Sequence, residues 1–502
     1  MVASESRSNG DNESSQQAGY DGMYDPLVAH NARVLDPTKA VKLVDDVLDT
    51  TIYIADGVLL RALPDSDELG GFIEFARTQR IDAVVDPANL ALLRRERARR
   101  DGQLREGLAE AWVTPVKLLP IDGVALVVDS WALLQQWRVS RLADTQAQAM
   151  VGIDHLMYAS PMTFGSPMTF GSPMTFGSPM TFGSSGSPRG QYVVPGFGGR
   201  TPVAWIGAPP ARHEELACRR PVVAVLDTGV GSHPWLSQGV TVVPPPATAQ
   251  PERTGIVHDA LEGVLDSDSG HGTFIAGLIR QTCPDADIYA MRIMGSDGFV
   301  EESAMVNAIL ELLLDQPAEH QIDILSMSFG YYHEAPDDAR TDASLLGPLT
   351  VLAELGVLIV AAAGNDATDR RMFPAAFAQQ IPLLSVGAKN PSGSVALFSN
   401  SGDWVSIYET GAAVVSTLPV TFDASLQPAA RMRTADGTVR ETIDPDDFAG
   451  GFAVWSGTSF AAPIVAGKLA RWLLAHREDA ADPDVLGDPQ KAVADIMEAA
   501  HT

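Results

Sequence analysis

The sequence is short of cysteine, of basic residues and of long apolar runs, and each shortage excludes a class of protein. Two cysteines, Cys218 and Cys283, cannot by themselves form a disulfide framework or a metal cluster. Lys and Arg number 35 against 63 Asp and Glu, and the net charge of −28 repels phosphate backbones and anionic lipid. No apolar run reaches about 18 residues, the length that spans a bilayer. We therefore expect a soluble acidic surface, no nucleic-acid partner and no membrane insertion.

The first 25 residues contain mainly Ser, Asn, Gln, Gly and acidic residues. No apolar core follows basic residues there, so the stretch predicts a disordered tail and no Sec-type signal peptide. Cytoplasm is the expected location, with export by another route left open.

Residues 26–156 predict a small α+β domain. Strands are expected on both sides of Asp56 and Gly57, as a hairpin, and again over 113–118 and 124–128. Helices are expected over 67–79, 87–112 and 130–142. The second of these is rich in arginine, which we interpret as a solvated helix face rather than a binding patch: Arg94, Arg95, Arg97, Arg99 and Arg100.

Residues 157–215 predict a linker. The sequence Ser-Pro-Met-Thr-Phe-Gly occurs four times without change from Ser160 to Gly183, and Gly and Pro remain frequent after it. Proline and glycine in every copy exclude a regular helix or a central strand. A recent duplication under little structural constraint explains so perfect a repeat.

From Pro221 onward, apolar strands alternate with helices, which predicts a doubly wound, mostly parallel α/β sheet over residues 216–478. The run from Val222 to Leu226 is typical of a buried parallel strand, with polar residues at its carboxyl end. Residues 479–502 predict a tail with a helix over 489–499, which begins with Asp488 as cap and Pro489 in the first turn.

Three segments of this α/β region carry residues suited to acyl transfer. Asp227 ends the first strand in Leu-Asp-Thr-Gly-Val, and His271 stands in Ser-Gly-His-Gly-Thr, between two glycines. Ser459 stands in Gly-Thr-Ser-Phe-Ala-Ala-Pro, at the start of an apolar helix whose free N–H groups favour negative charge. A serine needs a base to remove its proton, and histidine serves as one near neutral pH.

The order Asp, His, Ser with these flanking residues resembles the subtilase superfamily, the subtilisin-like and proteinase K-like serine proteases, over about residues 216–477. The resemblance implies that His271 is the general base, that Asp227 orients it and that Ser459 is the nucleophile. It also implies that Asn365, in Ala-Ala-Ala-Gly-Asn, donates to the oxyanion together with the serine N–H.

The resemblance further implies a substrate-binding edge strand at Ser328, Phe329 and Gly330, which would pair with an extended peptide. Ala362, Ala363 and Gly364 would form the other wall of the primary specificity pocket. If Met372 faces inward, very large side chains are excluded, and an apolar or medium-sized preference follows. Calcium is implied by the family alone. Asp266 and Asp268 could bind a cation, but a solvated turn is the simpler interpretation, and we expect no metal site and no cofactor.

Cys218 and Cys283 each precede a strand of the implied sheet, so a disulfide and two buried thiols both fit. The expected function is a serine endopeptidase acting on proteins or peptides, with its own N-terminal domain as an intramolecular partner. That domain is either a propeptide removed by cleavage in the linker, where the repeats offer an accessible site, or a retained recognition domain. The alternative function is a catalytically silent binding module.

Overall fold

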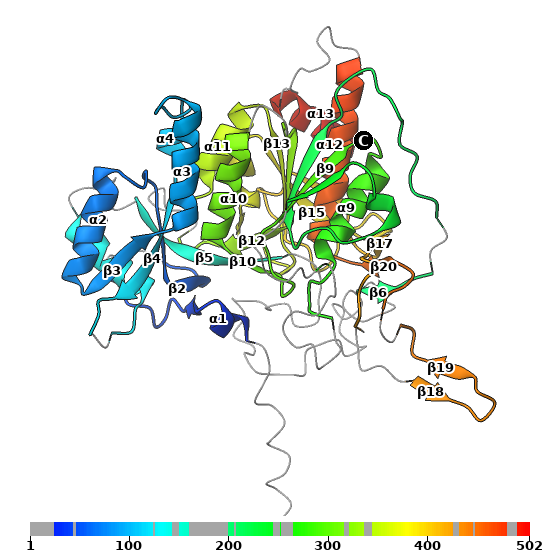
Figure 1. Cartoon of the computed structure of the whole chain (residues 1–502), viewed down its shortest axis with the longest axis horizontal. Coiled ribbons are helices and arrows are strands. Elements are labelled where there is room, and N and C mark those ends of the chain that lie inside the picture. Colours follow the sequence, from blue (N-terminus) through cyan, green and yellow to red (C-terminus); the bar gives the residue numbers. More distant parts are fainter. Residues whose placement is uncertain are drawn as a thin grey trace, which may run out of the picture.

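The computed structural model describes residues 25–43, 47–123, 126–142, 150–159, 199–204, 207–243, 252, 265–315, 321–335, 344–424, 431–444, 447–478 and 489–501. The repeats from Ser160 to Gly183 and the expected tail before residue 25 lie outside these ranges. Two parts lie side by side in Figure 1: an N-terminal segment up to residue 159, and an α/β unit from residue 199 onward.

The α/β unit is built on a parallel sheet of seven strands. Every neighbouring pair is parallel, and the central strands are mainly apolar because both of their faces are covered. In spatial order the strands are β16 (Ile407–Thr410), β15 (Leu383–Lys389), β13 (Leu358–Ala362), β11 (Ile324–Met327), β7 (Val222–Asp227), β9 (Asp287–Arg292) and β8 (Val240–Val243).

Helices cover both faces of this sheet, so the doubly wound prediction is confirmed. Val223 and Val225 of β7 pack into one apolar cluster, whereas Ala224 and Leu226 pack into another, as the two-residue period of a strand requires. The first cluster contains residues of α9 (His271–Thr282) and α12 (Thr458–Glu478), and the second contains residues of α10 (Glu302–Asp315) and α11 (Leu346–Glu354).

Smaller elements complete the α/β unit. The C-terminal helix α13 (Pro489–His501) packs on α12, where Trp472 Nε1 donates to Asp495 Oδ2 at 3.0 Å. No helix of the described ranges is long and apolar enough to cross a membrane. The remaining elements are β6 (Thr201–Pro202), η1 (Pro234–Leu236), β14 (Met372–Phe373), η3 (Ala375–Gln379), β17 (Val414–Thr417), β18 (Arg431–Arg433), β19 (Val439–Glu441) and β20 (Phe452–Trp455).

The N-terminal segment does not have a sheet to itself, because its strands continue into strands of the α/β unit. The path runs β14-β12-β5-β2-β4-β3, with β1 on β2 and β10 on β5. Strand β5 (Val151–Ala159) extends past residue 156, where we expected the linker to begin. The other elements are α1 (Pro26–Ala29), β1 (Ala32–Leu35), β2 (Thr51–Leu60), α2 (Asp67–Thr78), β3 (Ile81–Val85), α3 (Pro87–Arg99), α4 (Leu108–Ala111), β4 (Thr114–Pro120), α5 (Ser130–Ser140), β10 (Phe299–Glu301) and β12 (Phe329–Tyr332).

The predicted hairpin at Asp56 and Gly57 is wrong, because β2 is one continuous strand through both residues. Its pairing with β5 shifts register between Tyr53 and Val58, as at a β-bulge. A Cβ at Gly57 would lie 2.9 Å from Asp154 Oδ2, so the glycine allows a close approach rather than a turn. The helix expected over 87–112 is also interrupted, since α3 ends at Arg99.

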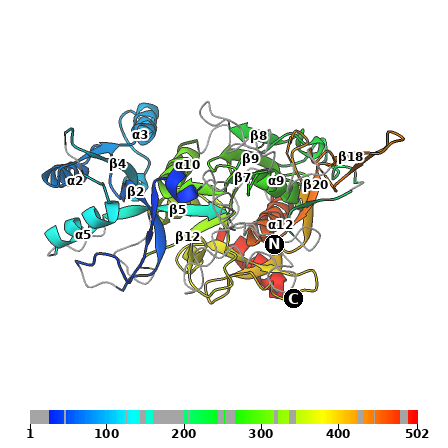
Figure 2. The same ribbon diagram turned by 90° about the horizontal axis from the view of Figure 1, so that it is seen from below.

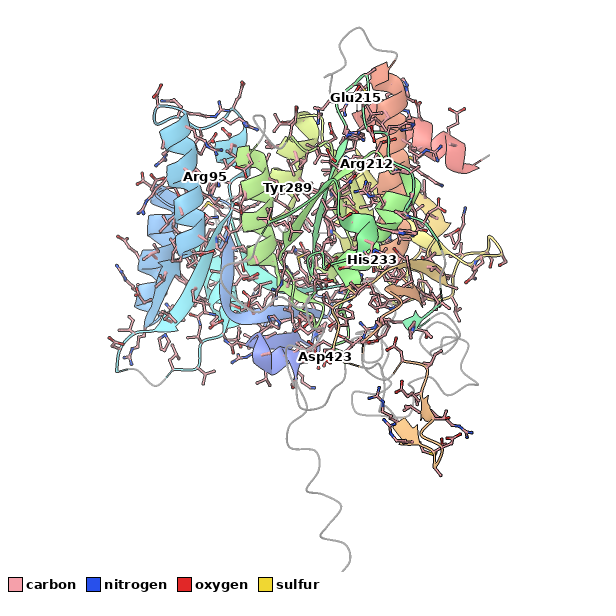
Figure 3. All side chains as sticks on the ribbon, turned by 45° about the vertical axis from the view of Figure 1, so that its right-hand side comes forward. Arg95, Arg212, Glu215, His233, Tyr289 and Asp423 are labelled. Atoms are coloured by element: carbon pink, nitrogen blue, oxygen red, sulfur yellow. The ribbon has the colours of Figure 1, made fainter. Side chains whose placement is uncertain are left out.

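The arginines of α3 are not a purely solvated face, as we had expected. Arg95 lies 3.8 Å from Glu311 Oε1 and 3.5 Å from Asp315 Oδ1, both on α10, and its position between the helices is visible in Figure 3. Arg99 Nη1 donates to the carbonyl of Leu314 at 2.7 Å. These arginines join the N-terminal segment to the α/β unit.

The two parts also share one apolar core. Trp112, Leu156 and Met157 of the N-terminal segment belong to the same buried cluster as Met305 of α10 and Phe329 of β12. Fully burying an apolar side chain stabilises a fold by about 1.5–3 kcal/mol, so these shared side chains help to hold the two parts together.

Candidate active site

The structure brings Asp227 and His271 together at the carboxyl end of β7. His271 Nδ1 lies 2.8 Å from Asp227 Oδ1 and 3.0 Å from Oδ2. Asp227 is the last residue of β7 and His271 is the first residue of α9. Both are buried, at 1% and 0% exposure. A carboxylate held at this distance fixes which nitrogen of the ring carries a proton.

Glycines allow these two segments to pack directly on one another. A Cβ at Gly272 would lie 2.1 Å from the carbonyl oxygen of Gly229, a distance no side chain tolerates. Gly270 has a φ of +84°, in the left-handed region that glycine adopts without strain, and it precedes the helix. The two glycines around His271 therefore have a backbone role.

Ser459 is the second residue of α12 and is fully buried. Ser328 Oγ donates to its carbonyl oxygen at 3.0 Å, which ties the start of the helix to the residue before β12. Within the described ranges, Ser459 Oγ and His271 Nε2 are buried without a hydrogen-bond partner. These are the two atoms between which a proton must move if the serine is a nucleophile.

Asn365 lies beside the first turn of α12. Its Oδ1 accepts hydrogen bonds from the N–H of Thr458 at 3.0 Å and from Thr458 Oγ1 at 2.9 Å. Because the amide oxygen of Asn365 faces Thr458, its amide nitrogen points away from Thr458.

Negative charge surrounds the imidazole of His271. Burial alone would lower the pKa of His271, but Asp227, and more weakly Asp268 and Glu252, raise it above its ordinary value. Asp268 is itself buried, and burial raises its pKa to about 6. The interpretation of Asp266 and Asp268 as a solvated turn is therefore wrong for Asp268.

The expected substrate-binding strand pairs with the chain's own β5. Phe329 lies opposite Ala159 and Gly330 lies opposite Tyr158 in an antiparallel register, while β10 pairs with the other edge of β5. The N–H of Ala159 donates to the carbonyl of Gly298 at 2.8 Å. Figure 2 shows β5 reaching from the N-terminal elements to the α/β unit. The sequence of the first repeat follows β5 directly.

Met372 faces inward between the two expected pocket walls. A Cβ at Gly364 would lie 2.3 Å from Met372 Sδ, and one at Gly330 would lie 3.0 Å from Met372 Cε and Cγ. Ala362, Ala363 and Met372 are fully buried. Met372 therefore lies between Gly330 and Gly364, with side-chain atoms close to both glycines.

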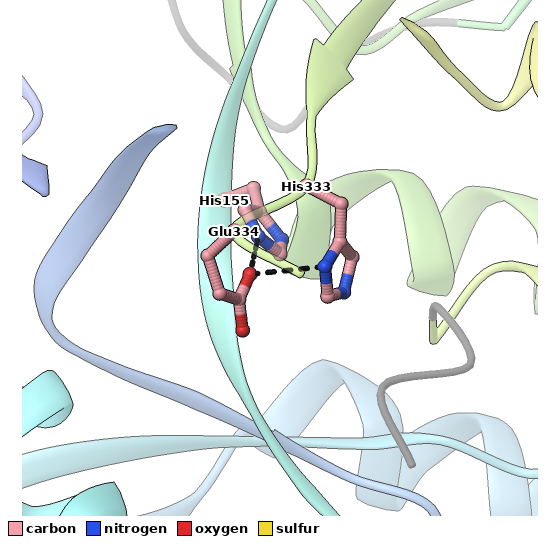
Figure 4. Close-up of side chains that lie close together, drawn as sticks. All are labelled: His155, His333 and Glu334. Carbon is pink, nitrogen blue, oxygen red and sulfur yellow. Dashed lines mark hydrogen bonds and ion pairs between the residues drawn. The ribbon is translucent and has the colours of Figure 1, made fainter. Parts of the chain in front are cut away.

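A buried polar cluster that we did not predict holds β5 against the α/β unit (Figure 4). His155 Nδ1 lies 2.6 Å from Glu302 Oε2, and His155 Nε2 lies 2.8 Å from Glu334 Oε2. Burial alone would lower the pKa of His155, but Glu302 and Glu334 raise it to about 10. Tyr331 donates to Glu302 at 3.2 Å, and Arg138 Nη2 lies 4.0 Å from Glu334 Oε1.

His155, His333 and Glu334 are close enough to hold a metal ion, but their contacts favour an ionic network. Both nitrogens of His155 face carboxylates, as in a doubly protonated ring. His333 Nδ1 accepts the N–H of Ala335 at 3.0 Å, which uses its lone pair. Two imidazoles are poor ligands for the calcium that the family implies. No other such group occurs within the described ranges.

The structure also shows the state of the two cysteines and a buried carboxylate, Glu252. Cys218 and Cys283 are separate buried thiols, so the disulfide alternative is not realised. Glu252 is buried and accepts a hydrogen bond from Thr228, the residue after Asp227, and the sequence did not predict it because no motif surrounds it.

Comparison with known proteins finds similarity over the same region of the chain that contains Asp227, His271 and Ser459. The model of the subtilase family, Peptidase_S8, matches residues 219–487, which is more than half of the 502 residues. Subtilisin BL of Lederbergia lenta is 28% identical over 235 residues, which cover 45% of this chain and 76% of the relative. Subtilisin E of Bacillus subtilis (strain 168) is 26% identical over 286 residues, 55% of this chain and 61% of the relative.

The share of a known protein that is matched varies. The alkaline protease of Alkalihalobacillus alcalophilus is 28% identical, and this chain spans about half of it, 54%. Among solved structures, the patellamide maturation protease is 24% identical with a TM-score of 0.38, over 55% of this chain and 84% of that one. Fervidolysin from Fervidobacterium pennivorans is 18% identical with a TM-score of 0.46, over 88% of this chain and 57% of that one.

Proposed function

Because the chain belongs to the subtilase family of serine proteases, we propose that it is an endopeptidase with Asp227, His271 and Ser459 as its catalytic triad. The observation that carries this proposal is the 2.8 Å contact between His271 Nδ1 and Asp227 Oδ1. The two reactive atoms, Ser459 Oγ and His271 Nε2, are buried and without a partner in the described part of the chain.

In the proposed reaction, His271 Nε2 removes the proton of Ser459 Oγ as the oxygen attacks the peptide carbonyl. Asp227 stays ionised and stabilises the imidazolium that forms. His271 then gives the proton to the leaving amine, and the acyl-enzyme is hydrolysed by water activated by the same histidine. The backbone N–H of Ser459 and the amide of Asn365 stabilise the oxyanion.

The position of Met372 narrows the expected apolar or medium-sized preference to small residues before the scissile bond. Its thioether lies against both Gly330 and Gly364, the glycines of the opposite walls. Filling a pocket in this way excludes large side chains by sterics, whereas small ones such as Gly, Ala or Ser still fit.

We further propose that residues 26–156 act as a propeptide-like domain and that the chain cleaves itself in the linker, 157–215. Strand β5 pairs with the residues expected to bind substrate, and its last residue, Ala159, lies opposite Phe329. Phe329 follows Ser328, whose hydroxyl contacts Ser459. Because the linker continues from Ala159 in sequence, we propose that it is the chain's first substrate.

Mass spectrometry of the purified chain tests self-processing. We expect a break within residues 157–215 in the wild type and an intact chain in Ser459→Ala. An intact wild type would favour a retained recognition domain and contradict removal. A break that persists in Ser459→Ala would assign the cleavage to another protease.

Labelling with a fluorophosphonate probe tests the enzyme itself. We expect stoichiometric modification of Ser459 in folded wild type and none in Ser459→Ala. Folded, processed protein that takes up no label would favour the silent binding module and overturn the proposed function.

A further inference from the structure

Glu252 joins the two segments that carry Asp227 and His271. The carboxylate is buried, with 4% of the residue exposed, and it accepts three hydrogen bonds. Thr228 Oγ1 lies 2.5 Å from Oε1, the N–H of Gly270 lies 3.1 Å from the same oxygen, and Thr273 Oγ1 donates to Oε2. Thr228 follows Asp227, whereas Gly270 and Thr273 flank His271.

The two threonine hydroxyls have a fixed direction. Thr228 Oγ1 accepts the N–H of Gly272 at 3.0 Å, and Thr273 Oγ1 accepts the N–H of Gly231 at 2.8 Å. Each hydroxyl has one proton, which goes to Glu252. Glu252 therefore anchors two bridges between the loop after β7 and the first turn of α9.

We propose that Glu252 is a positioning residue for the triad, which acts through Thr228 and Thr273 to hold Asp227 in register with His271. This inference rests on the proposed protease function. Glu252 touches neither Ser459 nor His271 by any hydrogen bond of the described residues, so it is not a catalytic residue.

The hydroxyl of Thr228 has two carboxylates within reach. It lies 2.5 Å from Glu252 Oε1 and 3.3 Å from Asp227 Oδ1. Because the nearer carboxylate takes the proton, Asp227 Oδ1 keeps its capacity for the N–H of Thr228 and the ring of His271. Without a charge at position 252, the hydroxyl turns to Asp227 and competes with His271.

Glu252 also contributes charge to the site. Burial raises the pKa of Glu252 to about 7, although its three donors oppose the rise. Its negative charge raises the pKa of His271. The charged groups that face it come from several elements: Asp227 of β7, His271 at the start of α9, Arg292 of β9, and Arg200.

The test is the pH dependence of fluorophosphonate labelling at Ser459 in full-length Glu252→Gln. We expect the limiting rate at high pH to fall about tenfold to a hundredfold, the effect of removing a partner that orients a functional histidine. The acid limb of the profile moves to lower pH, because His271 loses a nearby negative charge. In the wild type both His271 and Glu252 ionise along this acid limb, whereas in Glu252→Gln only His271 does.

Controls separate this inference from the function on which it rests. Glu441→Gln, on the exposed strand β19, should label at the wild-type rate and with the wild-type profile. Thr228→Val tests the same link if Glu252→Gln fails to fold, and it should slow labelling similarly. A wild type that does not label overturns the protease function. A labelled wild type with Glu252→Gln or Thr228→Val within roughly twofold of it, at an unchanged midpoint, overturns the role of Glu252.

Discussion

His155 Nε2 lies 2.8 Å from Glu334 Oε2 and joins β5 to the residues that follow strand β12. The second nitrogen of the same ring meets Glu302 at 2.6 Å. An imidazolium between two buried carboxylates therefore holds the N-terminal segment on the α/β unit.

The stability of this contact should fall as the pH rises. The pKa of His155 is raised from 6.5 to about 10 in the folded chain. The stabilisation of the folded chain by protonated His155 is therefore complete below pH 6.5 and is lost as the pH rises to about 10. In a Ser459→Ala background, His155→Gln should lower the free energy of unfolding by about 3 kcal/mol at neutral pH. Urea titrations should show this difference shrinking toward alkaline pH.

The matched control for this measurement is His476→Gln, an exposed histidine of α12. Its effect on the free energy of unfolding should be small at every pH. A difference between His155→Gln and its parent that stays constant from neutral to strongly alkaline pH would contradict an ionised His155.

Shortening Met372 should widen the specificity of cleavage. Met372→Ala removes the thioether that lies against Gly330 and Gly364, so peptides with Phe or Leu before the scissile bond should gain about tenfold or more in kcat/KM relative to Ala peptides. A peptide-library profile measures this ratio. Met432→Ala, at an exposed position of β18, should leave it unchanged. An unaltered profile in Met372→Ala would place the pocket elsewhere.

Removing the amide of Asn365 should slow turnover with little effect on KM. We expect Asn365→Ala to lower kcat about a hundredfold to a thousandfold, the magnitude known for an oxyanion donor in subtilisin. Steady-state hydrolysis of one peptide gives both constants. Asn390→Ala, in the turn after β15, serves as the control. Equal losses in binding and turnover would indicate a role in holding Thr458 rather than the oxyanion.

Alkylation should find two free thiols. Cys218 and Cys283 are buried and are not bonded to one another, and burial raises the pKa of Cys283 above its ordinary value. The native chain should therefore react slowly, and the denatured chain should gain two labels without any reductant. Labels that appear only after reduction would reveal a bond between them.

The sequence was sufficient to predict those features that depend on local pattern. Apolar runs with polar ends located the parallel strands, and the glycines around His271 marked a place where two backbones meet. Each of these signals lies within about ten consecutive residues.

What escaped prediction depends on contacts between distant segments. Gly57 followed the rule for a turn, yet the side chain it accommodates, Asp154, is almost a hundred positions away. Arg95 resembled a solvent-facing residue because its partners, Glu311 and Asp315, belong to another element. Glu252 and His155 give no signal in sequence for the same reason, since a lone acid or imidazole acquires meaning only from its partners.

Strand β5 lies between β10 and β12, and this placement restricts which peptide segments could bind in its place. A slot bordered by strands on both sides admits one extended chain and nothing thicker, and a proline in its middle would leave a carbonyl without a donor. If substrates bind in this slot, as proposed, globular proteins would resist attack unless they offered a loose terminus or an unfolded loop, so the conformation of a target would matter as much as its side chains.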